Sequence, residues 1–254
     1  MFAYDKSVVT ALSVIIPTLN EEKYLPKLLR SLAEQDYVGK LQIVVVDGQS
    51  NDRTAEVARQ HKKRFVDFTV ITTDRGVSRQ RNLGAKLAKH EHLLFIDADI
   101  ILPRTFLRHI ANKASIQRPV IATTMHLPVR PNVADYLFAV AVQTYLLIAW
   151  PFYPIIPGSF ILTRKSLHEK INGFDERLVF AEDIDYGERM IAAGARYAFF
   201  AWPYILSSPR RLRQTGRLRL IYFWMKHHLY IAKNGPIHDP SKLSYPLGQH
   251  EDDD

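Results

Sequence analysis

Two aspartates that follow an apolar segment carry the clearest chemical signal in the sequence. Asp97 and Asp99 come directly after the run HLLFI at residues 92–96. Side chains two residues apart on an extended chain point to the same side, so we expect both carboxylates to face one site. Hard carboxylate oxygens suit Mg²⁺ or Mn²⁺, and such an ion would neutralise a nucleotide diphosphate. Paired acids are also common in loops. The position of this pair at a strand end is therefore the reason to expect a metal site.

Polar residues follow two earlier apolar runs in the same way. The first group is Pro17, Thr18, Asn20 and Glu21, after residues 12–16, and the second is Asp47, Gly48 and Ser50, after residues 41–46. A helix cap or a turn explains any one of them. Three strand ends with carboxylate or amide groups indicate a site, because sites in parallel sheets lie at the carboxyl ends of the strands.

Short β-branched runs alternate with helical stretches along the first half of the chain. The runs lie at residues 12–16, 41–46, 65–71, 92–96 and 120–124, and the helical stretches at 21–35, 52–62, 78–89 and 104–116. This alternation predicts an α/β protein with βαβ units around a mostly parallel sheet. No linker divides the chain, so we expect one domain. Residues 1–206 are its body, and residues 207–254 are a basic helical extension with an acidic tail.

Four segments resemble, in order and spacing, the motifs of the family 2 glycosyltransferases of the GT-A fold. They are SVIIPTLNEE (13–22), VVVDGQSNDRT (44–54), LLFIDADI (93–100) and GFDERLVFAEDIDYGERM (173–190). The resemblance covers roughly residues 11–200. It implies a single GT-A-type domain whose central sheet is flanked by helices. It also implies metal-assisted transfer of a sugar, with inversion, from a UDP- or GDP-linked donor to an acceptor hydroxyl or lipid phosphate.

The resemblance also implies a role for each matching residue. Residues for the donor base and ribose are Pro17, Thr18, Asn20, Glu21 and Asp47. Asp99 is the expected direct ligand of a Mn²⁺ or Mg²⁺ cofactor, with Asp97 nearer the ribose or sugar, and Arg79 and Arg81 are expected to face the donor. Asp183, in a pair with Glu182, matches the general base, which removes the proton of the acceptor hydroxyl.

The positive charge of the chain is concentrated near its end. The sequence has 34 Lys and Arg against 26 Asp and Glu, and the segment between Glu188 and Asp239 holds nine of these basic residues and no acid. Such a patch suits phosphates or an anionic membrane surface, and something anionic is expected to neutralise part of it. The stretch 207–219 resembles a flexible lid over the donor diphosphate, with Arg210 and Arg211 as its phosphate contacts. The sequence does not identify a third protein ligand for the metal.

A long uncharged segment separates the two halves of the chain. Residues 136–150 can form a helix, but fifteen residues span about 22 Å, less than the roughly 30 Å core of a bilayer. We expect a buried helix or a homodimer contact through residues 136–163, with shallow membrane insertion as the weaker alternative. The absence of cysteine excludes disulfides and thiolate chemistry. The first residues lack a signal-peptide pattern, which predicts a cytoplasmic protein, with the inner face of the membrane as a place of contact.

Other functions use the same residues. A retaining glycosyltransferase or a nucleotidyltransferase needs the paired aspartates but not Asp183. A non-catalytic module could bind an anionic membrane or nucleic acid through the basic segment, but the acids at the strand ends would repel a nucleic acid. The acceptor of a glycosyltransferase is either a saccharide or a polyprenyl phosphate on this evidence.

Overall fold

The fold is that of a computed structural model, which describes residues 11–116, 120–149, 156–235 and 237–239. The strands are β1 (Ala11–Thr18), β2 (Lys40–Asp47), β3 (Asp67–Thr72), β4 (His92–Ile96), β5 (Ile100–Ile101), β6 (Val120–Pro128), β7 (Phe160–Arg164) and β8 (Arg196–Ser207). The helices are α1 (Leu25–Ala33), α2 (Thr54–Gln60), α3 (Val77–Leu87), α4 (Phe106–Ile116), α5 (Val133–Ala149), α6 (Lys165–Lys170), α7 (Glu182–Ala192), α8 (Arg210–Thr215) and α9 (Arg217–Asn234), with the 3₁₀ turn η1 (Lys62–Arg64).

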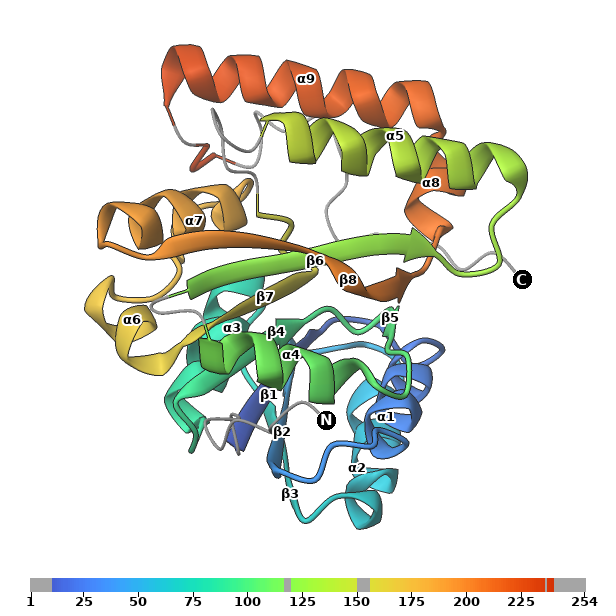
Figure 1. The fold of residues 1–254 in the computed structure, drawn as a ribbon, viewed down its shortest axis with the longest axis vertical. Coiled ribbons are helices and arrows are strands. Elements are labelled where there is room, and N and C mark those ends of the chain that lie inside the picture. The colour runs from blue at the N-terminus through green and yellow to red at the C-terminus, as the bar shows by residue number, and fades with distance from the viewer. Residues whose placement is uncertain (1–10, 117–119, 150–155, 236, 240–254) are drawn as a thin grey trace, which may run out of the picture.

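The strands form one mostly parallel sheet with helices on both faces (Figure 1). Their order is β3-β2-β1-β4-β7-β6-β8-β5. The first four are parallel to one another, whereas β7 runs antiparallel to both of its neighbours. This arrangement confirms the α/β class and the mostly parallel sheet that the sequence predicts.

Strand β1 shows why a strand of this sheet can contain a continuous apolar run, here residues 14–17. Val14 and Ile16 belong to the core that contains α1 and α4, whereas Ile15 belongs to the core on the opposite face, with residues of α3 and α7. Since successive side chains of a strand point to opposite faces, both sides of β1 are buried. A parallel strand covered on both faces therefore carries no alternating polar residues.

Helix α3 lies unusually close to β1. A Cβ atom added at Gly84 would be 2.2 Å from Cγ2 of Ile15. Only glycine permits this approach, which sets the depth at which α3 packs on the sheet. Gln80 and Arg81 belong to the same helix. The close contact at Gly84 therefore also determines how near their side chains lie to the carboxyl ends of the strands.

The order of the strands reverses at β1. The chain passes from β1 to β2 and β3 on one side and then returns to place β4 on the other side of β1. Ligands of open α/β sheets bind at such a reversal, outside the carboxyl ends of the strands. Thr18, Asp47 and Asp97 lie at the carboxyl ends of β1, β2 and β4, so the fold brings the predicted strand-end residues together.

Helix α5 is not buried within this chain, which was the first of the two positions predicted for it; the predicted homodimer contact stays a prediction. Asp135 and Gln143 are buried, but Leu137, Tyr145 and Ile148 are each more than 60% exposed. The reason is that α5 packs on β6 along one side only and leaves the other side uncovered within this chain. None of the described helices is both long enough and apolar enough to cross a bilayer.

The basic segment forms two helices. Arg210–Thr215 form helix α8, which Gly216 (φ 83°) joins to α9. Acids from distant parts of the chain neutralise several of its cations. Asp135 pairs with Arg217 at 2.7 Å, and Glu21 pairs with Arg210. Part of the positive charge of the segment is thus neutralised within the chain.

Candidate active site

Asp47 is the centre of a polar cluster at the ends of β1 and β2. Its carboxylate accepts hydrogen bonds from the backbone N–H of Ser50 at 3.0 Å and from the Ser50 hydroxyl at 2.5 Å. The hydroxyl of Thr18 donates to it at 3.4 Å. Asp47 is buried, so these donors hold the carboxylate in one orientation. A carboxylate oriented in this way can accept a further N–H from a ligand.

Two loops are joined above this cluster. The backbone N–H of Asn20 donates to the Ser50 hydroxyl at 2.9 Å, and the Asn20 side chain accepts from the N–H of Asn51 at 2.8 Å. Asn20 has a φ of 56°, a left-handed conformation that asparagine tolerates better than most residues. Asn20 therefore has a structural role in the loop as well as an exposed position beside the site.

Glu21 and Arg210 are 189 residues apart in sequence and form an ion pair at the site. Nη1 of Arg210 lies 3.0 Å from Oε2 of Glu21, and Nη2 lies 3.7 Å from Oδ2 of Asp99. The Arg210 guanidinium also lies over the ring of Tyr24, 4.4 Å from its centroid. Burial raises the pKa of Glu21 to about 7, although Arg210 acts in the opposite direction. Helix α8 thus reaches the strand-end acids directly.

The paired aspartates lie in a turn and not on an extended strand. Strand β4 ends at Ile96, and the N–H of Ile100 donates to the carbonyl of Asp97 at 3.3 Å. The prediction that strand alternation aligns the two carboxylates is therefore wrong. Instead, the two side chains have different partners: Asp99 lies beside Arg210, and Asp97 lies 3.2 Å from Arg81.

Arg81 connects the aspartate turn to the start of α7. Its Nη2 donates to Asp97 at 3.2 Å and to the carbonyl of Gly158 at 2.9 Å, and its Nη1 donates to Glu182 at 2.9 Å. The Arg81 side chain is only 2% exposed. Nearby Asp97, Glu182 and Asp183 raise the pKa of Arg81, although burial has the opposite effect and is the largest single influence. Arg81 is thus a buried cation that bridges acids of two motifs.

Asp183 is held by backbone groups. Its Oδ2 accepts the N–H of Gly158 at 2.7 Å, and its Oδ1 accepts the N–H of Ile184 at 2.9 Å. Burial and, to a smaller extent, the neighbouring Glu182 raise the pKa of Asp183 to about 7. A carboxylate with a raised pKa is a stronger base once it is ionised, which suits it to accept a proton near neutral pH.

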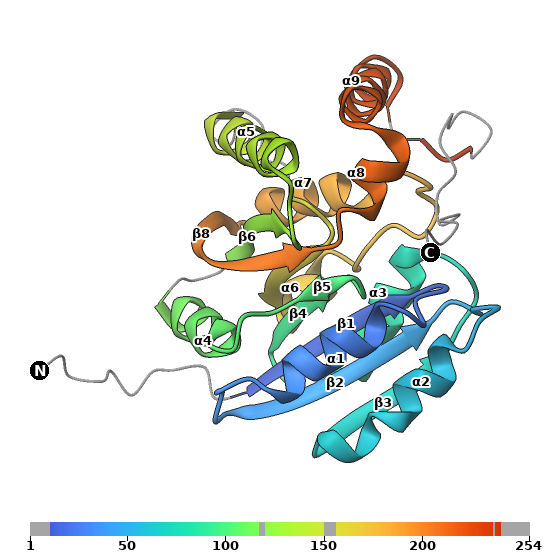
Figure 2. The same cartoon turned by 90° about the vertical axis from the view of Figure 1, so that its right-hand side faces the viewer.

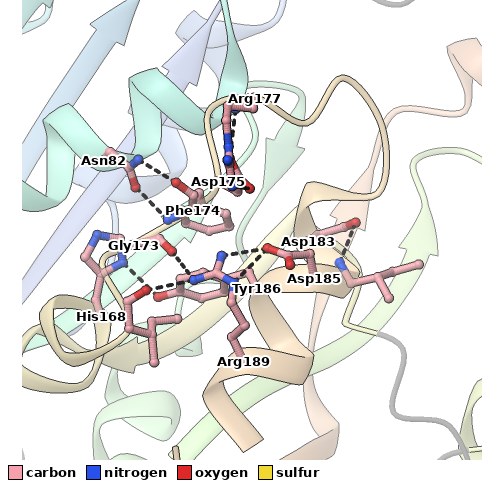
Figure 3. Close-up of polar contacts among 12 residues, drawn as sticks. Asn82, His168, Gly173, Phe174, Asp175, Arg177, Asp183, Asp185, Tyr186 and Arg189 are labelled. Carbon is pink, nitrogen blue, oxygen red and sulfur yellow. Dashed lines mark hydrogen bonds and ion pairs between the residues drawn. The ribbon is translucent and has the colours of Figure 1, made fainter. Parts of the chain in front are cut away.

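The loop before α7 is clamped between two helices (Figure 3). Asn82 of α3 exchanges two hydrogen bonds with the backbone of Phe174, at 2.8 and 2.9 Å. Arg189 of α7 donates to the carbonyl of Gly173 at 2.7 Å and pairs with Asp185 at 2.6 Å. The ring of Phe174 stacks on Tyr186, with centroids 3.8 Å apart. The GFDE sequence therefore fixes the entry into α7 and, through it, the position of Asp183.

The other predicted site residues have varied positions. Arg79 is partly exposed and pairs with Asp74 at 3.1 Å and with Glu176 at 3.2 Å, so it lies on the surface beside the GFDE loop. Pro17 is buried in β1, in register with Val46 of β2. Arg211 belongs to α8, but its side chain is outside the part of the structure that is described.

Residues 13–171 match the family described as Glycosyl transferase family 2. The chain belongs to this family. The matched range includes β1, β2, β4 and the aspartate turn, but it ends before the pair Glu182 and Asp183. The family match thus covers the acids that follow β1, β2 and β4, and not the pair that starts α7.

Curated relatives in this family are similar over part of their length. A 4,4'-diaponeurosporenoate glycosyltransferase of Staphylococcus haemolyticus is 38% identical over 109 residues, which are 40% of this chain and 28% of the relative. A PGL/p-HBAD biosynthesis glycosyltransferase of Mycobacterium bovis is 40% identical over 89 residues, 34% of each protein. The similar stretches thus span about a third or less of these relatives.

Solved structures share the fold. A mannosyltransferase of Pyrobaculum calidifontis in complex with GDP-Man and Mn²⁺ has a TM-score of 0.67 at 23% identity, over 91% of this chain and 66% of that one. Staphylococcus aureus TarS in complex with UDP-GlcNAc has a TM-score of 0.63 at 22% identity, over 84% of this chain and 66% of that one. These likenesses confirm the GT-A-type fold.

The donor set of this family 2 chain fits a divalent cation that shares its ligands with a substrate. Asp97 and Asp99 supply hard oxygen ligands, and Glu21 is close enough to influence them. Among the described residues, no group of three His, Asp or Glu side chains is arranged to hold an ion by itself. Mg²⁺ and Mn²⁺ commonly bind one or two carboxylates together with substrate phosphates and water, so Asp97 and Asp99 are the residues that could hold such an ion.

Sequence reasoning missed two residues of the site. Gly158 accepts from Arg81 and donates to Asp183 through its backbone alone, and a Cβ atom there would lie 2.9 Å from Arg81 and 3.0 Å from Asp183. Tyr24 supports Arg210 by a ring contact. In the sequence, Gly158 is marked only by the preceding Pro157, a pair typical of a turn, and by the apolar residues 160–162 that follow.

Proposed function

We propose that the protein is a glycosyltransferase that moves a sugar from a UDP- or GDP-linked donor to an acceptor hydroxyl, with inversion and with a divalent metal. The observation that carries this proposal is the bridge that Arg81 makes between Asp97 and Glu182. It joins the strand-end acids, suited to the donor, to the pair that starts α7. A donor bound at the strand-end acids would therefore lie next to an acceptor bound at the start of α7.

On the donor side, Asp47 and Thr18 would bind the base and the ribose at the ends of β1 and β2. Asp97 and Asp99 would hold Mn²⁺ or Mg²⁺, which supplies positive charge to a departing diphosphate when it is bound. Arg210 lies beside Asp99 and would add a cation on the same side. The excess of carboxyl over guanidinium groups at the site would repel a diphosphate without a metal, which supports the metal requirement.

On the acceptor side, Asp183 would remove the proton of the attacking hydroxyl. Its hydrogen bonds to two backbone N–H groups leave its orientation fixed, which favours proton transfer in a defined direction. A phosphate acceptor is largely ionised near neutral pH and needs no such base. The raised pKa of Asp183 thus supports a hydroxyl acceptor, of the kind found on a saccharide, over a polyprenyl phosphate.

A donor screen tests this proposal. The purified chain is incubated with UDP- and GDP-linked sugars in the presence of Mn²⁺ or Mg²⁺, and released nucleoside diphosphate is measured. We expect slow release from one donor class, which EDTA abolishes and which Asp99→Asn reduces at least about tenfold. Release that persists in EDTA would disprove the metal role. A nucleotidyltransferase would instead use a nucleoside triphosphate and a sugar phosphate and release pyrophosphate, so pyrophosphate release in a parallel incubation with these substrates would contradict the proposal.

A further inference from the structure

Helices α5 and α9 place an apolar surface at one end of the molecule. Both views show the two helices together, at the end opposite α2 and β3 (Figures 1 and 2). The salt bridge between Arg217 and Asp135 connects the start of α9 to the start of α5. Phe138 of α5, with Leu218 and Ile221 of α9, lines a groove of about 500 Å³ between them. The two helices therefore contribute to one continuous surface.

Helix α9 has three distinct sides. Its buried side carries Leu220, Phe223 and His227, which are at most 9% exposed. A second side is apolar but exposed, and consists of Leu218 (82%), Ile221 (37%), Tyr222 (68%) and Met225 (59%). At 100° per residue these four positions fall within one arc of the helix. The rest of the chain thus buries one side of α9, and a second apolar side is exposed to solvent.

The third side of α9 is cationic. Arg219, Lys226 and Lys233 are exposed and follow one another at intervals of seven residues, so they form a stripe along one edge of the exposed apolar arc. No acid lies between Glu188 and Asp239 to interrupt it. An apolar arc bordered by a basic stripe is the pattern of a helix that lies in the interface of a membrane with anionic lipids.

Helix α5 extends this surface without adding charge. Its exposed side carries Tyr136, Leu137, Val140, Tyr145, Leu147 and Ile148. Apart from Asp135, which is buried and paired with Arg217, the helix has no charged residue. Exposed apolar surfaces of this extent mark sites of interaction in soluble domains.

We propose that the face formed by α5 and α9 docks on the surface of an anionic phospholipid bilayer. The apolar residues of both helices would enter the boundary of head groups and acyl chains, and Arg219, Lys226 and Lys233 would lie among the anionic head groups. A second copy on the same face would offer these cations no acid as a partner, because α9 has none and the one acid of α5, Asp135, is buried and paired with Arg217. Charge complementarity therefore favours the bilayer over a second copy.

Docking would bring the candidate site close to the membrane. Phe180, two residues before Glu182, packs against Phe223 and His227 on the buried side of α9, with ring centroids 5.5 and 5.1 Å away. Arg210, in the helix that leads into α9, contacts Glu21 at the donor side. The membrane face is thus connected to both sides of the candidate site.

The first test is co-sedimentation of the full chain with phospholipid vesicles. One set contains phosphatidylcholine alone, and the other contains equal parts of phosphatidylcholine and phosphatidylglycerol. We expect binding to the anionic vesicles to be at least about tenfold tighter, and to weaken as salt is added. Equal binding to both sets, or no binding to either, would overturn the proposal.

A charge variant and its matched control locate the contact. The variant combines Arg219→Gln, Lys226→Gln and Lys233→Gln, and the control combines Lys62→Gln, Lys63→Gln and Arg64→Gln in η1, next to β3. Each cation near an anionic surface strengthens binding about fivefold, so the variant should lose about 100-fold and the control should change little. Equal losses would show attraction by net charge alone and would overturn the assignment to this face.

An apolar variant separates the bilayer from a second copy. Leu218→Ser, Tyr222→Ser and Met225→Ser replace exposed side chains, so the fold should persist, as circular dichroism checks. We expect at least about a tenfold loss of binding to anionic vesicles. Light scattering should show a monomer for the wild type. A wild-type dimer that this variant turns into a monomer would show that a second copy covers the face, and would overturn the proposal.

Discussion

Asp183 lies where burial and the neighbouring Glu182 oppose its ionisation, and both raise its pKa, to about 7. A general base acts only in its ionised form. We therefore predict that kcat/KM rises about tenfold per pH unit below pH 7 and levels off above it. A pH–rate profile with the natural donor and acceptor measures this directly.

The raised pKa of Asp183 also affects stability. As pH rises, the free energy of unfolding should fall, whereas the rate of transfer should increase. The pKa of Asp183 is higher in the folded state than in the unfolded state, so folding binds a proton between these two values. The free energy of unfolding should therefore decrease as pH rises from about 4 through 7, and Asp183→Asn should remove this decrease. A flat pH–rate profile, or a variant with unchanged pH dependence of stability, would contradict the assigned ionisation.

Arg81 and Arg79 offer a comparison of a buried and an exposed arginine on one helix. Arg81 is 2% exposed and pairs with Asp97 and Glu182, whereas Arg79 is 43% exposed and pairs with Asp74 and Glu176. Arg81→Met should lower the free energy of unfolding by about 3 kcal/mol, since it leaves buried acids without their cation. Arg79→Met should lower it by less than about 1 kcal/mol. Similar losses in urea denaturation would refute the bridging role of Arg81.

At the scale of elements, periodicity and motifs predicted the parallel strands and the helices between them. These features depend on local sequence, because a run such as residues 41–46 is apolar wherever both faces of a strand are buried. The position of the site followed from the strand order, since residues after β1, β2 and β4 must meet. Asp97 and Asp99 could therefore be selected as candidate site residues from the strand pattern, whereas Asp183 was selected through the resemblance to a family motif.

The remaining features depend on contacts between distant residues. Nothing local to Arg210 indicates Glu21 as its partner, and nothing local to Arg217 indicates Asp135. Composition predicted that α5 is either buried or in contact with a second copy, because a helix that is apolar all round does not reveal how many of its sides the chain covers. The backbone role of Gly158 has no side-chain signal at all.

The contact between α3 and β1 gives a prediction at this scale. Gly→Ala inside a helix usually stabilises it by about 0.5–1 kcal/mol. At Gly84 the added Cβ would lie 2.2 Å from Ile15, and overpacking of a buried contact costs about 1–3 kcal/mol. We therefore predict that Gly84→Ala destabilises the protein, as measured by thermal or urea unfolding.

A double-mutant cycle supplies the control. Ile15→Ala removes the atoms that the new Cβ would meet. The double variant of Gly84→Ala with Ile15→Ala should thus be less destabilised than the sum of the two single changes. Additive losses, or a stabilised Gly84→Ala variant, would show that α3 does not approach β1 so closely.

At the scale of the whole molecule, residues from the beginning of the described chain and from its last third lie together in one site. Arg210 of α8 reaches Glu21 after β1 and Asp99 after β4. Arg210→Ala should weaken binding of a nucleoside diphosphate by about 1–3 kcal/mol, because it removes a cation from a site rich in carboxylates. Arg213→Ala, which changes a more exposed cation paired with Asp135, is the matched control. Titration calorimetry in the presence of Mn²⁺ compares the two, and tighter binding by Arg210→Ala would show that Arg210 competes with the metal for Asp99.

The most direct test of the account is the rate of sugar transfer by Asp183→Asn, with the donor that the screen identifies and a hydroxyl acceptor. Asparagine has nearly the shape of aspartate but cannot take the proton from the acceptor. The account predicts that kcat falls by about 10² or more while donor affinity is nearly unchanged. Transfer at the wild-type rate would contradict the account, because Asp183 would then not be the general base that takes the proton of the acceptor hydroxyl.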